Sequence, residues 1–363
     1  MKHIIIDARL YGPKHTGLGR YTKNLLLSLP KTKDFKKYKF TLLVYPELAQ
    51  EIATDLDGHY RYVITNLRHY SISEQIFLPV LLKKLKPDLV HFTHLDKPIF
   101  YFGRSIVTIH DLIRHFSKGP DTTTRSPLLY WPKYWGYLLM TKIIFATSHL
   151  IVPSNYWRDY LIHKENINPT KVTTTYEAVD PTFLALKRQS ALAPKRYILY
   201  TGNLYPHKNI SVVLKAMESL PDLKLKIICA RSLFQERLQK NTNPNQIEFL
   251  GYVDDKDFPR LYSQALALVH PSLIEGFSLT GLEAMALGCP VISSNTSCLP
   301  EIYQDSVLYF DPKKPSALVD QIKKLQLDPT LRQQLIDKGD KQVKKYSWLK
   351  TARETLNVYS QTI

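Results

Sequence analysis

Short apolar runs of strand length alternate with helix-length runs along most of the chain, and the whole alternation occurs twice. The strand-like runs are 4–6, 40–45, 60–65, 89–92, 106–110 and 150–153 in the first half, and 197–200, 225–229, 247–250, 266–270, 291–292 and 307–310 in the second. Strands that alternate with helices form parallel sheets with helices on both faces. The sequence therefore predicts an α/β protein with two Rossmann-like domains.

The length of the chain also fits two domains. A chain of 363 residues exceeds the size at which a single hydrophobic core usually stops growing. Residues 177–195 combine Pro and charged residues with little periodicity, which is typical of a hinge. We expect a first domain at 1–180, a second domain at 190–345 and a C-terminal helix at 346–363.

One segment of the second domain predicts a strand, a loop and a helix that could bind a phosphate. A strand-like run at 265–271 precedes it, and apolar residues at helical spacing in 279–287 end at Gly288. The helix is expected to open at Phe277, Ser278 and Leu279. Its first backbone N–H groups and the positive end of its dipole favour a bound phosphate at that position.

Two acidic residues frame the same segment. Glu275 lies on the loop, and Glu283 lies about one turn inside the predicted helix, with seven residues between them. Carboxylates at these positions can accept hydrogen bonds from sugar or ribose hydroxyls, so both residues are predicted to bind a nucleotide sugar. The alternative is an amphipathic helix with two solvated acids.

The Glu-x7-Glu motif, with the block Ala284-Met285-Ala286-Leu287-Gly288-Cys289-Pro290-Val291-Ile292 and then Leu299-Pro300-Glu301, resembles retaining glycosyltransferases of the GT4 type. This resemblance implies the GT-B fold, in which two Rossmann-like domains face each other across a cleft. It also implies that the C-terminal helix returns to the first domain, which binds the acceptor, and that the second domain binds the nucleotide-sugar donor.

The stretch Thr201-Gly202-Asn203-Leu204-Tyr205-Pro206-His207-Lys208-Asn209 resembles the donor-phosphate loop of that family, in the form found in mannosyltransferase-like members. The resemblance implies that Gly202 allows close approach of the backbone and that Lys208 binds the diphosphate. Asn203 stands where many members carry Arg, which removes one fixed positive charge. The alternative for Lys208 is an ordinary surface lysine.

Two motifs of the first half complete the resemblance. His110 and Asp111 end a strand-like run, and family members carry His-Asp there, which implies that His110 lies against the donor sugar. Gly17 and Gly19 open a helix after the first strand, as the family's N-terminal glycine loop does. That loop lacks the third glycine and the later acidic residue of a dinucleotide fingerprint, so we expect no nicotinamide cofactor.

The net charge of +17 favours an anionic partner. No zinc-finger, RNA-recognition or convincing helix-turn-helix pattern is present, so we expect no nucleic-acid partner. Residues 126–142 mix Trp and Tyr with Lys, as interfacial segments do. An anionic membrane surface is therefore one candidate partner, and the alternative interpretation of 126–142 is a core helix.

The sequence indicates an intracellular protein. The apolar stretch after Met1 is too brief for a signal peptide, and no apolar run reaches the roughly 18 residues of a membrane span. Cys229, Cys289 and Cys298 lack metal-ligand spacing and are predicted to be reduced thiols. We expect a cytoplasmic location, with peripheral attachment to the inner face of the membrane as a second option.

No metal-ligand pattern is evident, and Asp55-Leu56-Asp57 is interpreted as a turn. We therefore expect no cofactor and a metal-independent reaction, in which Lys208 and helix N–H groups stabilise the leaving diphosphate. The expected enzyme is a retaining glycosyltransferase that moves a hexose from GDP-mannose or a UDP-sugar to a hydroxyl of a glycan or lipid-linked saccharide. The alternatives are a sugar-nucleotide epimerase of the same fold and an inactive sugar-nucleotide-binding subunit.

Overall fold

The computed structural model describes the chain except residues 57, 120–129, 187–195, 230–232 and 241. The described residues form two compact units. The first domain contains Met1–Asp111, residues 130–177 and Ser347–Ile363, and the second contains residues 112–119 and Ala178–Tyr346 apart from the gaps just named. The predicted hinge begins at this junction, and its residues 187–195 lie outside the described part of the chain.

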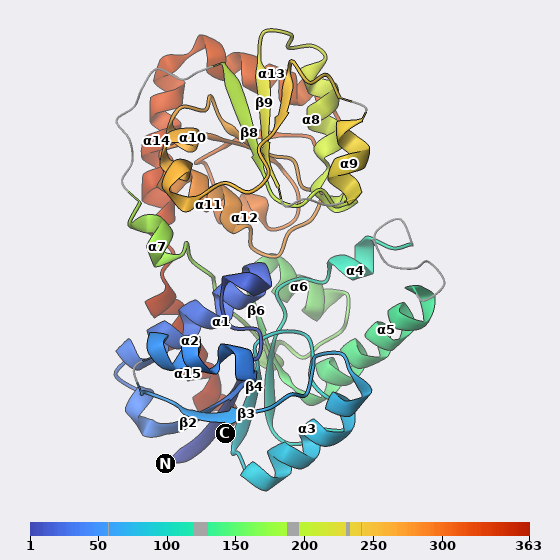
Figure 1. The fold of residues 1–363 in the computed structure, drawn as a ribbon, viewed down its shortest axis with the longest axis vertical. Coiled ribbons are helices and arrows are strands. Elements are labelled where there is room, and N and C mark those ends of the chain that lie inside the picture. The colour runs from blue at the N-terminus through green and yellow to red at the C-terminus, as the bar shows by residue number, and fades with distance from the viewer. Residues whose placement is uncertain (57, 120–129, 187–195, 230–232, 241) are drawn as a thin grey trace. The chain divides into compact units, whose positions relative to one another are not determined.

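The first domain is built on a parallel sheet with the strand order β3-β2-β1-β4-β5-β6-β7 (Figure 1). Its strands are β1 Lys2–Asp7, β2 Tyr38–Val44, β3 Arg61–Ile64, β4 Leu89–Phe92, β5 Ser105–Thr108, β6 His149–Val152 and β7 Val172–Thr174. The apolar side chains of β1, β2, β4 and β5 are buried, because both faces of the sheet are covered by helices. The short, Thr-rich β7 was not predicted from the sequence.

The order of the strands fixes the face on which each helix lies. The helices are α1 Thr16–Ser28, α2 Ala49–Asp55, α3 Ile72–Leu85, α5 Tyr130–Thr147 and α6 Asn155–His163. The chain moves in one direction from β1 to β3 and in the other from β3 through β6. Because crossover connections between parallel strands are right-handed, α1 and α2 cover one face of the sheet, and α3 and α5 cover the other.

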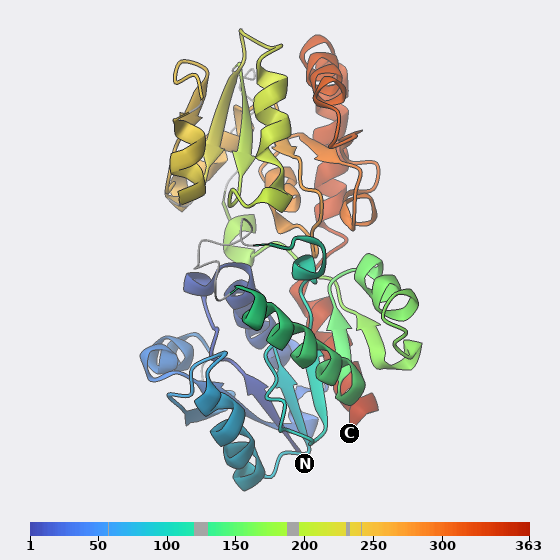
Figure 2. The same ribbon diagram turned by 90° about the vertical axis from the view of Figure 1, so that its right-hand side faces the viewer.

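The last helix, α15 Trp348–Thr362, packs in the first domain (Figure 2). Tyr359 Oη lies 2.7 Å from Nδ1 of the buried His91 on β4, whose Nε2 lies 2.8 Å from Thr108 Oγ1. Thr351 Oγ1 donates to the Tyr176 carbonyl at 2.5 Å. The predicted return of the C-terminal helix to the first domain is confirmed.

The second domain repeats the architecture around the sheet β10-β9-β8-β11-β12-β13, which is also parallel. Its strands are β8 Tyr197–Thr201, β9 Lys224–Ile228, β10 Ile247–Phe249, β11 Leu268–His270, β12 Val291–Ser294 and β13 Leu308–Phe310. Its helices are α7 Pro181–Leu184, α8 Ile210–Met217, α9 Leu233–Gln239, α10 Phe258–Ser263, α11 Leu279–Ala286, α12 Leu299–Tyr303, α13 Pro315–Leu327 and α14 Pro329–Val343. The prediction of two Rossmann-like domains is thereby confirmed.

The described part of the aromatic segment at 126–142 forms the beginning of helix α5. Residues 126–129 of the segment lie outside the described residues. Tyr134 and Tyr137 are buried, whereas Trp131, Trp135 and Leu139 are 48%, 64% and 58% exposed. The segment is therefore a surface helix with an exposed aromatic face and not a helix buried on all sides. Within the described residues, no helix combines the length and the apolar character that a membrane span requires.

Two smaller expectations concern polar and sulfur-containing residues. The three cysteines are buried and unpaired, as predicted.

The segment 55–57 was predicted to be a turn. Asp55 ends α2, and its Oδ2 accepts hydrogen bonds from Tyr11 Oη at 2.9 Å and Lys23 Nζ at 2.7 Å. Asp57 lies outside the described residues.

Candidate functional site

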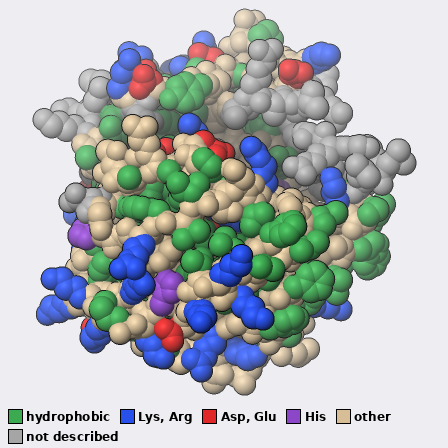
Figure 3. Space-filling model, turned by 60° about the horizontal axis from the view of Figure 1, so that its bottom comes forward, with side chains coloured by type: hydrophobic (Ala, Val, Ile, Leu, Met, Phe, Trp, Pro, Cys, Tyr) green, Lys and Arg blue, Asp and Glu red, His purple; other side chains and the backbone are tan. Residues whose placement is uncertain are grey.

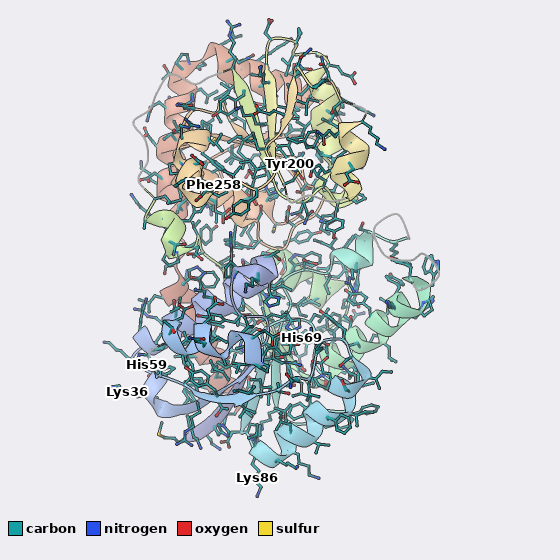
Figure 4. The ribbon with its side chains drawn as sticks, viewed as in Figure 1. Lys36, His59, His69, Lys86, Tyr200 and Phe258 are labelled. Atoms are coloured by element: carbon teal, nitrogen blue, oxygen red, sulfur yellow. The ribbon has the colours of Figure 1, made fainter. Side chains whose placement is uncertain are left out.

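The loop after β8 begins with a glycine in a conformation that other residues rarely adopt. Gly202 has φ 142°, and its N–H donates to the Ile228 carbonyl at 3.0 Å. Tyr200, which extends from β8 (Figure 4), donates its hydroxyl to the Asn203 carbonyl at 2.6 Å. The side chain of Asn203 is exposed. The loop is therefore held through its backbone.

Lys208 follows in a short 3₁₀ turn, Pro206–Lys208, which ends at Asn209 with φ 54°. Asn209 Nδ2 donates to the carbonyls of Pro271 and Pro312, and these bonds fix the end of the turn. Lys208 Nζ donates to Glu275 Oε1 at 2.7 Å. Because β8 and β11 are neighbours in the sheet, the loops that follow them bring these two charges together.

Glu275 is held from several sides. Its Oε1 also accepts from His270 Nε2 at 3.0 Å, and its N–H donates to Ser297 Oγ at 3.1 Å. Burial alone would raise the pKa of Glu275, but the charge of Lys208 and the hydrogen bond from His270 lower it well below its usual range. Glu275 is therefore an anion that the protein has already paired with a cation.

Helix α11 begins next to this pair, at the predicted position. Ser278, with φ 78°, directly precedes it. Ser278 Oγ lies 2.6 Å from Tyr303 Oη, which lies 3.0 Å from His270 Nδ1, donates to the Ser278 carbonyl at 3.0 Å and accepts from Gly281 N–H at 3.1 Å. The hydroxyl of Tyr303 thus holds both the start of α11 and the imidazole of His270, which binds Glu275.

The other predicted residues of this segment differ in how they are placed. Leu279 is the first residue of α11 and is partly exposed. Phe277 is buried, and its ring packs edge-on against Tyr346 with 5.3 Å between the centroids. Glu283 lies in α11 and is also largely buried. Any role of Phe277 in binding therefore rests on its backbone.

In the first domain, His110 lies just beyond the end of β5, and both of its ring nitrogens have partners. Nε2 donates to the Thr93 carbonyl at 2.9 Å, and Nδ1 lies 3.0 Å from Glu177 Oε1. Burial alone would lower the pKa of His110, but the hydrogen bond and charge of Glu177 raise it above its ordinary value. The geometry favours an imidazolium that donates from both nitrogens.

The two glycines at the start of α1 have different surroundings. Gly19 is buried, and a Cβ at this position would clash with the Gly12 carbonyl oxygen and lie 2.9 Å from the Leu10 carbonyl oxygen. Gly17 is exposed, and a Cβ there would meet nothing within 4 Å. The packing of its own loop therefore requires a glycine at position 19. At position 17 the protein leaves room for a side chain.

The structure thus brings Lys208, Glu275 and the start of α11 together in the second domain, and places His110 and the glycine loop in the first. The sequence reasoning missed His270, Tyr303 and Glu177. His270 was recognisable as the polar residue that ends an apolar strand-like run, five positions before Glu275. No sequence signal identified Tyr303 or Glu177, because each reaches its partner only through the tertiary fold.

Comparison with protein-family descriptions finds two matches in succession. Residues 15–183 match Glycosyltransferase Family 4, and residues 184–342 match Glycosyl transferases group 1. Together they cover residues 15–342, which include most of both domains.

Proteins with related sequences and folds agree with these matches. O-antigen chain mannosyltransferase B of Escherichia coli is 27% identical over 95% of this chain and 96% of its own. O-antigen chain mannosyltransferase RfbU of Salmonella typhimurium is 26% identical over 90% of this chain and 92% of its own. A sucrose-phosphate synthase structure from Thermosynechococcus elongatus superposes with a TM-score of 0.74 at 19% identity, covering 99% of both chains, which shows a shared GT-B fold.

Proposed function

Because the chain belongs to the glycosyltransferases that combine a Family 4 segment with a group 1 segment, we propose that it is a retaining, metal-independent hexosyltransferase. It transfers mannose from GDP-mannose to a hydroxyl of a glycan or lipid-linked saccharide. Support for mannose comes from the two O-antigen mannosyltransferases, which match this chain over nearly their whole length. A UDP-sugar is the alternative donor.

The observation that carries the proposal is the ion pair between Lys208 and Glu275 beside the start of α11. A nucleoside diphosphate that leaves the sugar develops negative charge. Lys208 Nζ and the positive end of the α11 dipole stabilise that charge without having to reorganise. Glu275 holds the ammonium in place and accepts hydrogen bonds from donor hydroxyls.

The transfer itself needs no protein nucleophile. The acceptor hydroxyl attacks the anomeric carbon from the face that the diphosphate leaves, the bond from that carbon to the phosphate oxygen breaks, and the hydroxyl proton passes to a phosphate oxygen. His110, held as a cation by Glu177 and the Thr93 carbonyl, contributes positive charge in the first domain. The binding roles of Gly17, Gly19, Gly202, Asn203, Phe277, Ser278, Leu279 and Glu283 remain part of this proposal.

The first domain exposes a group of apolar side chains that could lie against a membrane carrying a lipid-linked acceptor. We call it the apolar face; its exposed side chains are Ile72, Ile76, Phe77, Val80, Phe100, Phe102, Trp131, Trp135 and Leu139. They belong to α3, to α5 and to the loop after β4, which α3 holds through the bond from Ile99 N–H to Gln75 Oε1 at 2.9 Å. Because α3 and α5 cover the same face of the sheet, these side chains extend from one side of the domain.

Basic residues accompany the apolar face. Lys83, Lys84 and Lys86 follow the apolar residues of α3, and Lys133 and Lys142 lie on α5, all of them exposed. Figure 3 shows hydrophobic side chains interspersed with Lys and Arg on the face of the molecule that it presents. Aromatic and aliphatic side chains with Lys around them bind an anionic bilayer surface. We propose that the enzyme acts as a cytoplasmic protein bound peripherally to such a surface.

A donor panel tests the proposed function. Purified protein is incubated with GDP-mannose, GDP-fucose, UDP-glucose and UDP-galactose, with and without a lipid extract, and nucleoside diphosphate and epimerised donor are both quantified. GDP release that depends on GDP-mannose and on the extract is expected. Epimerised donor without diphosphate release would indicate an epimerase, and donor binding without either product would indicate an inactive binding subunit.

Chelation tests the metal-independent step. Transfer in EDTA is expected to match transfer in buffer, because Lys208 and backbone dipoles balance the diphosphate charge. Loss of transfer in EDTA with recovery on addition of Mg²⁺ or Mn²⁺ would contradict this part of the proposal.

A further inference from the structure

A group of ionisable side chains, which we call the buried cluster, lies at the carboxyl edge of the first domain's sheet. Asp7 ends β1, His94 and Asp96 follow β4, and His69 and Glu74 lie after β3. Figure 4 labels His69 within the first domain. None of these residues belongs to the site described above.

Arg9 organises the carboxylates of the buried cluster. Its Nε donates to Asp7 Oδ1 at 2.8 Å, and its Nη2 lies 2.6 Å from both Asp7 Oδ2 and Glu74 Oε1. The side chains of Arg9, Asp7 and Glu74 have no exposed surface. The guanidinium therefore compensates part of the buried negative charge.

The compensation is incomplete, because three buried carboxylates, including Asp96, face one guanidinium. Fully ionised, these four groups carry a net charge of minus two. Uncompensated buried charge is costly, so either protons or a cation must neutralise it.

Two histidines in the buried cluster present unused nitrogens. Among the described residues, neither ring nitrogen of His94 has a hydrogen-bond partner, and the same is true of His69 Nε2 and Asp96 Oδ1. His94 is 2% exposed. Buried polar atoms without hydrogen bonds are rare in native structures and call for an explanation, which a bound ion would supply.

The distances suit a small coordination sphere. One ligand atom each of Asp7, His69 and His94 lie within 4.8 Å of one another, and so do those of His69, Glu74 and Asp96. His94 Nε2 lies 3.7 Å from Asp96 Oδ2, and His69 Nε2 lies 3.7 Å from Asp7 Oδ2. Ligand atoms around a tetrahedral Zn²⁺, each about 2.0 to 2.2 Å from the metal, are about 3.4 Å apart, so small side-chain movements suffice.

Tyr45 gives His69 the orientation of a metal ligand. Its Oη lies 2.8 Å from His69 Nδ1 and accepts from the His69 backbone N–H at 3.0 Å. Metal-binding histidines commonly donate the second ring N–H to an oxygen, which leaves the other nitrogen free for the metal. Here the free nitrogen is Nε2, which is the one directed into the buried cluster.

We propose that the buried cluster binds one divalent transition-metal ion of the Zn²⁺ type, with Asp7, His69 and His94 as ligands and Arg9 bridging Asp7 and Glu74 beside it. Imidazole with carboxylate favours such ions over Mg²⁺ and Ca²⁺, which prefer oxygen ligands alone. The two positive charges neutralise the cluster, and the ion joins the loops after β3 and β4. Its role is to hold this edge of the first domain.

Metal binding by the full chain tests the proposal directly. Protein with any affinity tag removed is stripped with chelator, then titrated with Zn²⁺ by calorimetry and with Co²⁺ by visible absorption. One equivalent is expected to bind, with Co²⁺ bands typical of nitrogen and oxygen ligands, and Zn²⁺ is expected to raise the Tm because it binds only the folded chain. A stripped protein that binds no equivalent of either ion would overturn the proposal.

Variants locate the ion. His69→Ala and His94→Ala are each expected to lose the equivalent and the Tm increase, and Tyr45→Phe to weaken binding by about 10- to 100-fold. His59→Ala is the matched control, because His59 is an exposed histidine of the same domain outside the buried cluster (Figure 4). Nucleotide binding by the second domain and circular dichroism verify that each variant is folded. Retention of the Co²⁺ bands in both His69→Ala and His94→Ala would place the ion elsewhere and overturn the proposal.

Discussion

Lys208 Nζ and Glu275 Oε1 are 2.7 Å apart, although 67 residues separate them in the chain. Each was expected to bind the donor, yet in the structure they bind each other. Lys208 therefore reaches the diphosphate from a position that Glu275 defines, and a change at either residue affects the other. A double-mutant cycle is needed to separate their contributions.

Replacement of Lys208 by Ala is expected to slow transfer by about 10²-fold, because the charge on the departing diphosphate loses its partner. The pKa of Glu275 should rise in this variant, since the Lys208 charge is what lowers it most. Steady-state kinetics of Lys208→Ala, Glu275→Ala and the double variant should give a coupling of about 0.5 to 3 kcal/mol. Strictly additive effects would show that the ion pair does not act as a unit.

Two glycines in helices form a matched pair for the packing of α11. Gly281→Ala places a methyl group against the Tyr303 hydroxyl and should cost about 1 to 3 kcal/mol of stability, with weaker donor binding. Gly136→Ala in α5 meets nothing within 4 Å and should stabilise by up to about 1 kcal/mol. Urea unfolding compares the two variants, and equal effects would contradict the assigned contact.

Gly17 and Gly19 allow a binding role to be separated from a packing role. Gly19→Ala is expected to destabilise the first domain through its clash with the Gly12 carbonyl. Gly17→Ala should change stability by no more than about 0.5 kcal/mol yet reduce transfer if a ligand approaches this backbone. Thermal unfolding and kcat/KM of each variant provide the comparison. Unchanged kcat/KM in Gly17→Ala would remove Gly17 from the site.

The docking of α15 should weaken in mild acid. Burial, followed by the charge of His110, lowers the pKa of His91 to about 3. Between that value and the ordinary 6.5, the unfolded chain binds a proton that the folded protein excludes, so stability falls as the pH decreases. The contribution of His91 between pH 7 and pH 5 is about 2 kcal/mol. Urea unfolding of the wild type and His91→Gln at both pH values should show the gap between them shrink by that amount, whereas parallel curves would contradict it.

Membrane binding by the apolar face should depend on both its aromatic side chains and its charge. Sedimentation with anionic liposomes is expected at low salt and should be lost at high salt, because each basic residue contributes about 1 kcal/mol and salt screens it. Trp131→Ala/Trp135→Ala should bind more weakly, whereas Tyr252→Ala, which removes a 90% exposed aromatic from the second domain, should bind normally. Equal binding to neutral vesicles would argue against an anionic surface.

The sequence predicted a helix correctly where apolar residues at helical spacing were followed by a residue that ends helices. The helix expected at 279–287 is α11 at Leu279–Ala286, because its apolar spacing ends at Gly288 with φ 73°. Contacts between side chains that lie far apart in the sequence could not be predicted from it. The neighbouring positions of β8 and β11 bring Lys208 to Glu275, and no local pattern encodes which strands become neighbours. The buried cluster was missed for the same reason, since its members come from three separate parts of the chain, which follow or end β1, β3 and β4.

The placement of α15 determines the order in which the chain can fold during synthesis. His91 leaves the ribosome 268 residues before its partner Tyr359. All strands of the second domain are made in that interval, so the second domain can close while β4 still lacks the helix that covers it. The first domain, although translated first, is the last to be completed. Until then the apolar surface that α15 covers is exposed in the nascent chain, which makes it a natural site for chaperone binding.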